Sequence, residues 1–332
     1  METYKAAVCT ALTGPDAVRL SDMPVAALPA GHVRIGVKAA GLNFPDLLMT
    51  RGEYQFRPDP PFVPGMEIAG EIIELGSIET GSGANGFTIG DRVMGGAKTG
   101  GFAEQIILPL AAIAPLPVTL SFEEGACWRA AAITAWHALH DKAQLQRGES
   151  VLVLGASGGV GMAAVKLAKH LGALVIGTGS SDAKRAAILA AGADHALDPA
   201  DEDLAAQVKS LTGGAGANVV CDPVGGSLAI TATRAISWGG RYLIVGFASG
   251  IIPQFPANHA MIKGYSLIGL RAGESSRRDP LLAEKSNAAM AKLANDGIMR
   301  PHISRRFTLD QVAMGLNALA DRSVIGRAVI DI

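Results

Sequence analysis

The chain has 332 residues, of which 49% are hydrophobic and 18% charged, and its formal net charge is −1. This length predicts two domains with substantial cores, and the balanced charge gives no reason to expect nucleic acid or an anionic membrane as a partner. No apolar run reaches the roughly 18 residues that span a bilayer, no basic-then-apolar leader opens the chain, and three scattered cysteines do not make a disulfide framework. We therefore expect a soluble, cytoplasmic protein.

Residues 1–120 predict an irregular β-rich domain with few helices. Short apolar runs alternate there with glycine and proline at short intervals. The clearest runs are His32–Ala39, Glu67–Leu75, Asp91–Met94 and Phe102–Leu108. Gly76–Gly86 predicts a surface loop, and Thr119–Asp141 then predicts a helix that leads into a second domain.

From residue 151 the pattern changes to alternating strands and helices. The expected strands are Val151–Leu154, Ala173–Thr178, Val219–Val224, Arg241–Phe247 and Tyr265–Leu270, and the clearest helices are Val160–Leu171 and Ser227–Ile236. This alternation predicts a parallel sheet covered on both faces. A helix follows at Pro280–Asp296, and the closing strand Gly326–Ile332 needs a sheet, for which the N-terminal domain is the expected host. We place the domains at residues 1–124 with 273–332, and at 125–272.

Residues 150–161, Ser-Val-Leu-Val-Leu-Gly-Ala-Ser-Gly-Gly-Val-Gly, form a strand, a tight turn and the start of a helix. This is the pattern of a dinucleotide site, in which glycines let the backbone approach a pyrophosphate that the helix N-terminus binds. Ala156 stands at the first glycine of the usual motif, and Gly158 and Gly161 fill the other two. The expected pyrophosphate contacts are Ser157, Gly158, Gly159, Val160 and Gly161.

The end of the next strand indicates which nucleotide is bound. A site that prefers NAD usually has a carboxylate there for the ribose 2′-hydroxyl, but this chain continues Thr178-Gly179-Ser180-Ser181. Small hydroxyl residues leave room for a 2′-phosphate, and Lys184 and Arg185 follow with positive charge. They could also be solvated residues of an ordinary helix, and Asp182 is a mild objection unless it only favours the helix N-terminus. We predict NADPH rather than NADH.

Four further segments carry a resemblance to a known family. They are Gly41-Leu42-Asn43-Phe44-Pro45-Asp46, Pro64-Gly65-Met66-Glu67-Ile68-Ala69-Gly70, Gly90-Asp91-Arg92-Val93 and Thr134-Ala135-Trp136. With the nucleotide motif, the chain resembles the zinc-independent medium-chain dehydrogenase/reductase superfamily, in particular its zeta-crystallin-like NADPH:quinone oxidoreductases. The resemblance implies an α/β protein with a GroES-like, β-rich catalytic domain and a Rossmann domain with a doubly wound parallel sheet.

The residues present predict a metal-free enzyme. A catalytic zinc needs about three protein ligands, and zinc alcohol dehydrogenases have cysteine where this chain has Leu42-Asn43 and histidine where it has Met66. Without a Lewis acid, alcohol oxidation loses its main stabilisation. Quinones and activated alkenes need less help, because hydrogen bonds or a proton donor can stabilise the charge that hydride attack creates.

The resemblance also implies catalytic residues, each with an alternative. Tyr54 matches the proton-donating tyrosine of enoyl thioester reductases, or it only packs against Pro58–Pro61. Asn43 would orient the nicotinamide or bind a substrate carbonyl, or it forms a turn before Pro45. Thr134 matches a threonine that contacts the nicotinamide, or it is an ordinary helix hydroxyl.

Further cofactor contacts come only from the resemblance. Those expected from the ends of later strands are Gly246, Phe247, Leu270 and Arg271. Arg322 matches a cofactor-phosphate contact and His195 a histidine near the adenosine phosphate, although either could be a surface residue.

The chain departs from these relatives at two places. Leu48 replaces a cofactor-contacting tyrosine. Arg129, in Cys127-Trp128-Arg129, could bind an acidic substrate or lie on a helix surface.

These observations predict an NADPH-dependent reductase that transfers hydride to a small-molecule quinone. One alternative is an enoyl, 2-alkenal or acyl-CoA thioester double-bond reductase with Tyr54 as proton donor. Another is a non-catalytic, crystallin-like protein that binds NADPH. The resemblance further suggests a homodimer formed through the edges of the nucleotide-domain sheets, with Tyr242–Ser249 and Tyr265–Leu270 as candidates.

Overall fold

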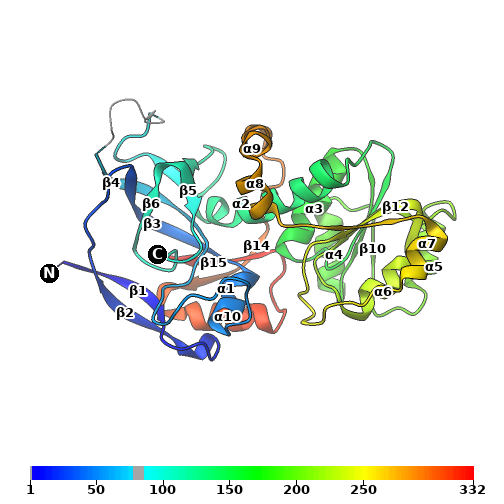
Figure 1. Ribbon diagram of the computed structural model, residues 1–332, viewed down its shortest axis with the longest axis horizontal. Coiled ribbons are helices and arrows are strands. Elements are labelled where there is room, and N and C mark those ends of the chain that lie inside the picture. Colours follow the sequence, from blue (N-terminus) through cyan, green and yellow to red (C-terminus); the bar gives the residue numbers. More distant parts are fainter. Residues whose placement is uncertain (1, 78–85) are drawn as a thin grey trace. The chain divides into compact units, whose positions relative to one another are not determined.

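Contacts between residues divide the chain into two units in the computed structural model, which describes residues 2–77 and 86–332 (Figure 1). Unit 1 comprises Met1–Arg129 and Ile303–Ile332, and unit 2 comprises Ala130–His302. Most of the loop expected over Gly76–Gly86 lies outside the described residues. Throughout residues 2–77 and 86–332, each helix is too short or too polar to span a bilayer.

Unit 1 is built on a seven-stranded sheet, as its apolar runs predict. Its strands run in the order β14-β15-β3-β4-β5-β7, and β6 pairs with β3. The bounds are β3 (His32–Leu42), β4 (Glu67–Leu75), β5 (Arg92–Gly96), β6 (Gln105–Pro109), β7 (Ile113–Pro115), β14 (Ile303–Thr308) and β15 (Arg327–Asp331). The closing strand β15 pairs antiparallel with β3, with Ala328 opposite Leu42, so the prediction that it joins the N-terminal domain is confirmed.

Smaller elements complete unit 1. The sequence pattern did not indicate the antiparallel pair β1 (Thr3–Cys9) and β2 (Val18–Pro24), or strand β14. The helical elements are η1 (Pro15–Ala17), α1 (Phe44–Thr50), η2 (Leu110–Ala112), η4 (Leu309–Gln311) and α10 (Val312–Ala320). Helix α2 (Phe122–Trp136) contains the boundary between the units, and a π-helix, η3 (His137–Lys142), continues it.

Unit 2 is built on a six-stranded parallel sheet in the order β10-β9-β8-β11-β12-β13. The strands are β8 (Ser150–Val153), β9 (Leu174–Thr178), β10 (His195–Leu197), β11 (Ala217–Asp222), β12 (Ile236–Ile244) and β13 (Ser266–Gly269). The helices are α3 (Gly159–His170), α4 (Asp182–Ala190), α5 (Leu204–Leu211), α6 (Gly226–Ala235), α7 (Ala257–Lys263), α8 (Ala272–Arg278) and α9 (Pro280–Asn295). The strand order reverses between β8 and β11, as in a dinucleotide-binding fold, and this confirms the predicted Rossmann domain.

Strand β8 is buried along its whole length, as its apolar run predicts. Strand β12 begins earlier than the predicted Arg241. A register shift lets Ile236 pair with Ala217 before Arg241 pairs with Val219.

The boundaries between the units differ from those expected at 124/125 and 272/273. Residues 125–129 group with unit 1, where the Cys127 thiol donates to the carbonyl of Ala328 in β15 over 3.6 Å. Helices α8 and α9 group with unit 2, because their side chains and those of α2 line a common cavity and Met290 is buried. Sequence patterning indicated a helix at Pro280–Asp296 but not the surface on which it packs.

Candidate functional site

The turn between β8 and α3 has the shape that a pyrophosphate site requires. A Cβ added to Gly161 would lie 2.4 Å from the carbonyl oxygen of Gly155, so only glycine fits where the helix crosses the turn. A Cβ added to Gly158 would meet nothing closer than 3.4 Å, so this side of the turn stays open. The predicted contact residues lie together at the start of α3: Ser157, Gly158, Gly159, Val160 and Gly161. The first-turn amides of a helix lack intrahelical acceptors, and they can bind a phosphate.

Thr178 supports this turn from the end of β9. Its hydroxyl accepts a hydrogen bond from the Gly155 amide at 3.0 Å, and its carbonyl accepts one from the Ala156 amide at 3.0 Å. Thr178 is almost completely buried. Its observed contacts are therefore structural, and a direct cofactor contact by Thr178 stays a prediction.

A cation and two hydroxyls lie together beyond Thr178. The Lys184 ammonium donates to the Ser180 hydroxyl at 3.3 Å, and the Ser181 hydroxyl caps α4 by accepting from the Lys184 amide at 3.3 Å. Arg185 differs, because its guanidinium pairs with Asp182 and Asp198. The structure thus brings together Ser180, Ser181 and Lys184, and the two carboxylates compensate the positive charge of Arg185.

The carboxyl ends of β11, β12 and β13 complete this edge of the sheet. Asp222 is buried at the end of β11, where one carboxylate oxygen accepts from the amides of Val224 and Gly225, each at 2.8 Å. Its other oxygen accepts from the Tyr242 hydroxyl at 2.8 Å. Burial raises the pKa of Asp222 despite these bonds. Sequence analysis missed this residue, although a carboxylate at the end of an apolar run was the available signal.

The residues expected to contact the cofactor from the later strands follow β12 and β13, and their contacts with the cofactor stay predictions. Gly246 and Phe247 follow β12, and the Leu270 amide donates to the Ile244 carbonyl at 3.1 Å. Arg271 is exposed just before α8. Open α/β sheets bind ligands at this edge.

His195 and Arg322 are the two remaining residues expected to contact the cofactor, and neither follows the carboxyl end of a strand in this sheet. His195 opens β10 opposite Ile176, two positions before Leu197 pairs with Thr178, and so lies further from this edge. Arg322 follows α10 in unit 1, with a φ of 54°. The roles of both residues stay predictions.

Unit 1 contains a buried polar cluster of Asn43, Asp46, Glu67 and Arg327. The Arg327 guanidinium donates to the Asn43 side-chain oxygen at 2.8 Å and to Glu67 Oε2 at 2.7 Å. The Asn43 side-chain nitrogen donates to the same Glu67 oxygen at 3.1 Å and to the Gly41 carbonyl at 3.2 Å. Asp46 accepts from the amides of Asn43 at 2.9 Å and Gly65 at 3.2 Å, which caps α1.

Burial shifts the pKa values of groups in and beside this cluster. It raises the pKa of Asp46 to about 7, although two backbone hydrogen bonds oppose the shift. It also raises the pKa of the Cys127 thiol to about 11. For Arg327, burial lowers the pKa, but Glu67, Cys127 and Asp46 together outweigh it and raise the pKa above its ordinary value, so the guanidinium stays charged. Sequence analysis missed the parts played by Glu67 and Arg327, although charged residues inside apolar strands were a usable signal.

The predicted catalytic residues have different surroundings. Tyr54 is half-buried in a loop of unit 1, and its hydroxyl makes no hydrogen bond within the part of the chain that the structure describes. The Asn43 amide is engaged in the polar cluster. Thr134 belongs to unit 2, where its hydroxyl donates to the Ala130 carbonyl at 2.8 Å. Direct contact of any of them with cofactor or substrate stays a prediction.

Comparisons with known proteins agree with this architecture. Residues 29–118 match the family model of the alcohol dehydrogenase GroES-like domain, and residues 159–287 that of zinc-binding dehydrogenase. Quinone oxidoreductase-like protein 2 homolog of Nematostella vectensis is 38% identical over 99% of this chain and 89% of its own length.

Two solved structures are similar over nearly their whole length. A probable oxidoreductase of Mycobacterium abscessus has a TM-score of 0.89 and 34% identity, with complete coverage of both chains. The quinone oxidoreductase of Thermus thermophilus, whose complex with NADPH was also determined, has a TM-score of 0.84 and 30% identity, covering 99% of this chain and all of the other. The chain belongs to the zinc-independent, quinone oxidoreductase-like medium-chain dehydrogenase/reductases.

A member of this superfamily is an oxidoreductase that binds a nicotinamide cofactor. The site geometry agrees, because the turn before α3 excludes a side chain at Gly161 and leaves Gly158 open toward a phosphate. One of the two matched family models describes a zinc-binding dehydrogenase. The side chains at the positions of the zinc ligands therefore decide whether this chain can bind the metal.

The side chains of this oxidoreductase do not fit a catalytic zinc ion. In residues 2–77 and 86–332, no three side chains of His, Cys, Asp or Glu are grouped to hold a metal. At the positions where zinc enzymes supply ligands, Asn43 is engaged with Arg327 and Glu67, and Met66 offers only a thioether. A catalytic zinc needs about three nitrogen, sulfur or carboxylate ligands.

Proposed function

We propose that this oxidoreductase transfers hydride from NADPH to a quinone. The preference for NADPH is supported by Ser180, Ser181 and Lys184, which lie together at the end of β9. A site that prefers NAD would usually have a carboxylate there. The bound nicotinamide would supply the hydride. The names of relatives support a quinone acceptor. Asn43 and Met66 at the positions of the zinc ligands support it too, because a quinone needs no Lewis acid.

Lys184 is the residue we expect to recognise the 2′-phosphate. Its ammonium lies beside the Ser180 hydroxyl at the end of β9, where the cofactor ribose is expected. A hydrogen bond to a charged group contributes about 1.5–3 kcal/mol.

Replacing Lys184 with alanine should weaken NADPH binding about 10- to 100-fold, because it removes that bond, and leave NADH binding nearly unchanged. Calorimetric titration of both cofactors into the same preparations would measure this. Lys38→Ala, a change at an exposed lysine of unit 1, is the control. Equal losses for NADPH and NADH would show that Lys184 does not read the phosphate.

The acceptor is tested by following NADPH oxidation with 1,4-benzoquinone and with crotonyl-CoA, each against an enzyme-free blank. Turnover of the quinone alone supports the proposal. Tight NADPH binding with no turnover of either acceptor would instead favour a crystallin-like binding protein.

One observation favours the alternative of an enoyl, 2-alkenal or acyl-CoA thioester reductase. The Tyr54 hydroxyl has no hydrogen-bond partner in the described chain, so it can donate a proton to a substrate carbon. Tyr54→Phe should then slow crotonyl-CoA reduction far more than quinone reduction, because only the alkene product carries a new C–H bond from a proton. Wild-type rates with both acceptors would leave Tyr54 a packing residue.

We also propose a homodimer, formed through β13. This strand is the edge of the unit 2 sheet, and large apolar side chains are exposed around it: Trp238, Met261, Ile262 and Leu267. Exposed apolar patches beside an unpaired edge strand favour association. Leu267→Lys should shift the protein to monomer in light scattering at micromolar concentration, whereas Leu281→Lys on α9 should not. A parent protein that is already monomeric would refute this proposal.

The thiols agree with the expected cytoplasmic location, which we also propose. All three cysteines are free and buried. A protein without disulfides suits a reducing compartment.

A further inference from the structure

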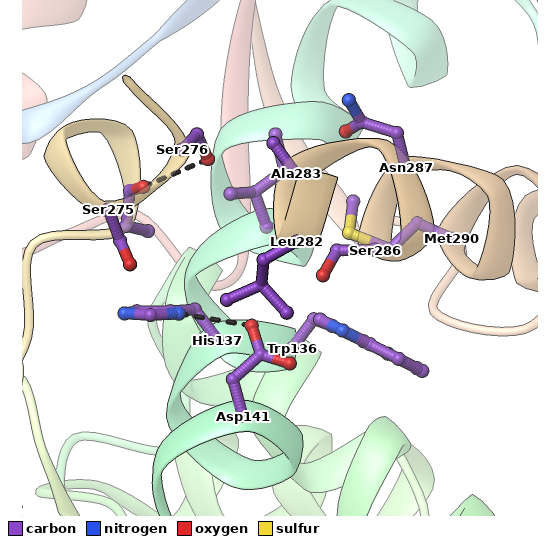
Figure 2. A pocket seen from close by; sticks show the side chains of 12 residues that line it. Trp136, His137, Asp141, Ser275, Ser276, Leu282, Ala283, Ser286, Asn287 and Met290 are labelled. Atoms are coloured by element: carbon purple, nitrogen blue, oxygen red, sulfur yellow. Dashed lines mark hydrogen bonds and ion pairs between the residues drawn. The ribbon is translucent and has the colours of Figure 1, made fainter. Parts of the chain in front are cut away.

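A small cavity in unit 2 lies between α2 with its π-helical continuation and the pair α8 and α9 (Figure 2). Its volume is about 20 Å³. Ile133, Trp136, His137 and Asp141 line one side, and Ala272, Ser275, Ser276, Leu282, Ala283, Ser286, Asn287 and Met290 line the other. π-helical turns occur frequently at functional sites.

A carboxylate between two imidazoles determines the chemistry of this cavity. Asp141 Oδ2 lies 3.1 Å from Nδ1 of His137, and Asp141 Oδ1 lies 2.9 Å from Nδ1 of His140. Burial raises the pKa of Asp141, but the hydrogen bonds and charge interactions with His137 and His140 together outweigh it and hold the pKa below its ordinary value. An ionised carboxylate only accepts hydrogen bonds, so both Nδ1 atoms carry the hydrogen.

This arrangement leaves the other ring nitrogen of His137 as a free acceptor. His137 is only 5% exposed, and its Nε2 has no hydrogen-bond partner among the residues that the structure describes. In Figure 2 the ring turns Nδ1 toward Asp141 and directs its far edge toward the side where Ser275 lies. A buried lone pair without a partner is unfavourable, so this nitrogen needs a hydrogen-bond or proton donor.

The charges around the cavity limit what can pair with this nitrogen. Asp141 and His137 are the only ionisable side chains that line it, and His140 contacts Asp141 from the exposed side. Helices α8 and α9 contribute only neutral polar groups to the lining, from Ser275, Ser276, Ser286 and Asn287. A bare anion would therefore meet the Asp141 charge without a cation to offset it, whereas a neutral acid brings its own proton.

We propose that this cavity is a binding site for a small monocarboxylic acid of the formate class, bound as an anion together with one proton. The acid O–H proton moves to His137 Nε2, and the carboxylate stays beside the imidazolium, with no other bond made or broken. Net charge in the site is unchanged. With about 20 Å³ against the roughly 10–15 Å³ that a single water needs, the cavity excludes any acid larger than formate. This site is independent of the proposed reductase activity.

The test follows the histidine ring nitrogens by NMR in full-length protein labelled with ¹⁵N-histidine, titrated with formate at several pH values between 6 and 8. We expect the His137 resonances to move to the imidazolium position on saturation. The apparent affinity for formate should rise by up to about tenfold for each unit that the pH falls, because one proton is taken up with each anion.

Variants separate this site from adventitious binding. His137→Gln should lose formate binding, whereas His302→Gln, a change at an exposed histidine, should bind as the parent does. Asp141→Asn keeps an acceptor for the ring N–H but removes the charge, and should weaken binding about 10- to 100-fold. This variant also serves if His137→Gln does not fold.

Three results would overturn the proposal. They are His137 resonances that formate does not move, binding that His137→Gln retains, and an affinity independent of pH that methanol matches. The last would assign the cavity to a neutral hydroxyl ligand instead.

Discussion

Replacing Arg327 with methionine is expected to reduce the free energy of unfolding by about 3–5 kcal/mol, because it removes the guanidinium that pairs with a buried carboxylate. Arg327 donates to both Glu67 and Asn43, and the side chains of Arg327 and Glu67 are 8% and 6% exposed. Glu67 would then lose its ion pair with Arg327, while the hydrogen bond from Asn43 at 3.1 Å and the charge interaction with Arg129 would stay.

Urea denaturation of parent and variant, followed by circular dichroism, measures this loss. Arg305→Met changes an exposed arginine of β14 and should stay within about 0.5 kcal/mol of the parent. The double variant Arg327→Met with Glu67→Met should recover part of the loss, because it removes both charges. If Arg327→Met and Arg305→Met cost the same, the cluster does not contribute as inferred.

The second large effect is a pH dependence of stability that comes from Asp46. Burial raises its pKa in the folded state to about 7, from an ordinary value of 3.8. Between these values the folded protein holds a proton at Asp46 that the unfolded chain has lost. The stabilisation is therefore complete below about pH 4 and is lost as the pH rises through about 7. At 1.36 kcal/mol for each unit of pKa, the total is on the order of 4 kcal/mol.

Asp46→Asn should remove this contribution, so that its free energy of unfolding falls less steeply between pH 4 and pH 7 than that of the parent. Denaturation curves at half-unit pH steps would measure both slopes. Asp321→Asn, at an exposed position of unit 1, should keep the parental slope. An Asp46→Asn slope equal to the parental one would mean that Asp46 is ionised throughout this range.

The sequence by itself determined the features that depend on neighbours along the chain. A strand, a tight turn and a helix within residues 150–161 specify the pyrophosphate turn, because backbone conformation and the room at Gly158 and Gly161 are local properties. The alternation of strands and helices after residue 151 likewise predicts a parallel sheet. The final strand needed a host, and pairing of β15 with β3 confirms the expected one.

Features that need partners from distant parts of the chain were decided only by the tertiary structure. Lys184 and Arg185 are adjacent cations in the sequence, but Asp198 comes to lie against Arg185 and compensates it. Glu67 and Arg327 are 260 positions apart, and only folding brings the two charges together and buries them.

The cavity beside His137 has the same origin, because α8 and α9 must pack against α2 before the histidine is enclosed. Local spacing sets which conformation a segment can adopt. Burial and charge compensation depend on which segments meet, and these decide the protonation and hydrogen bonding of the side chains that carry the chemistry.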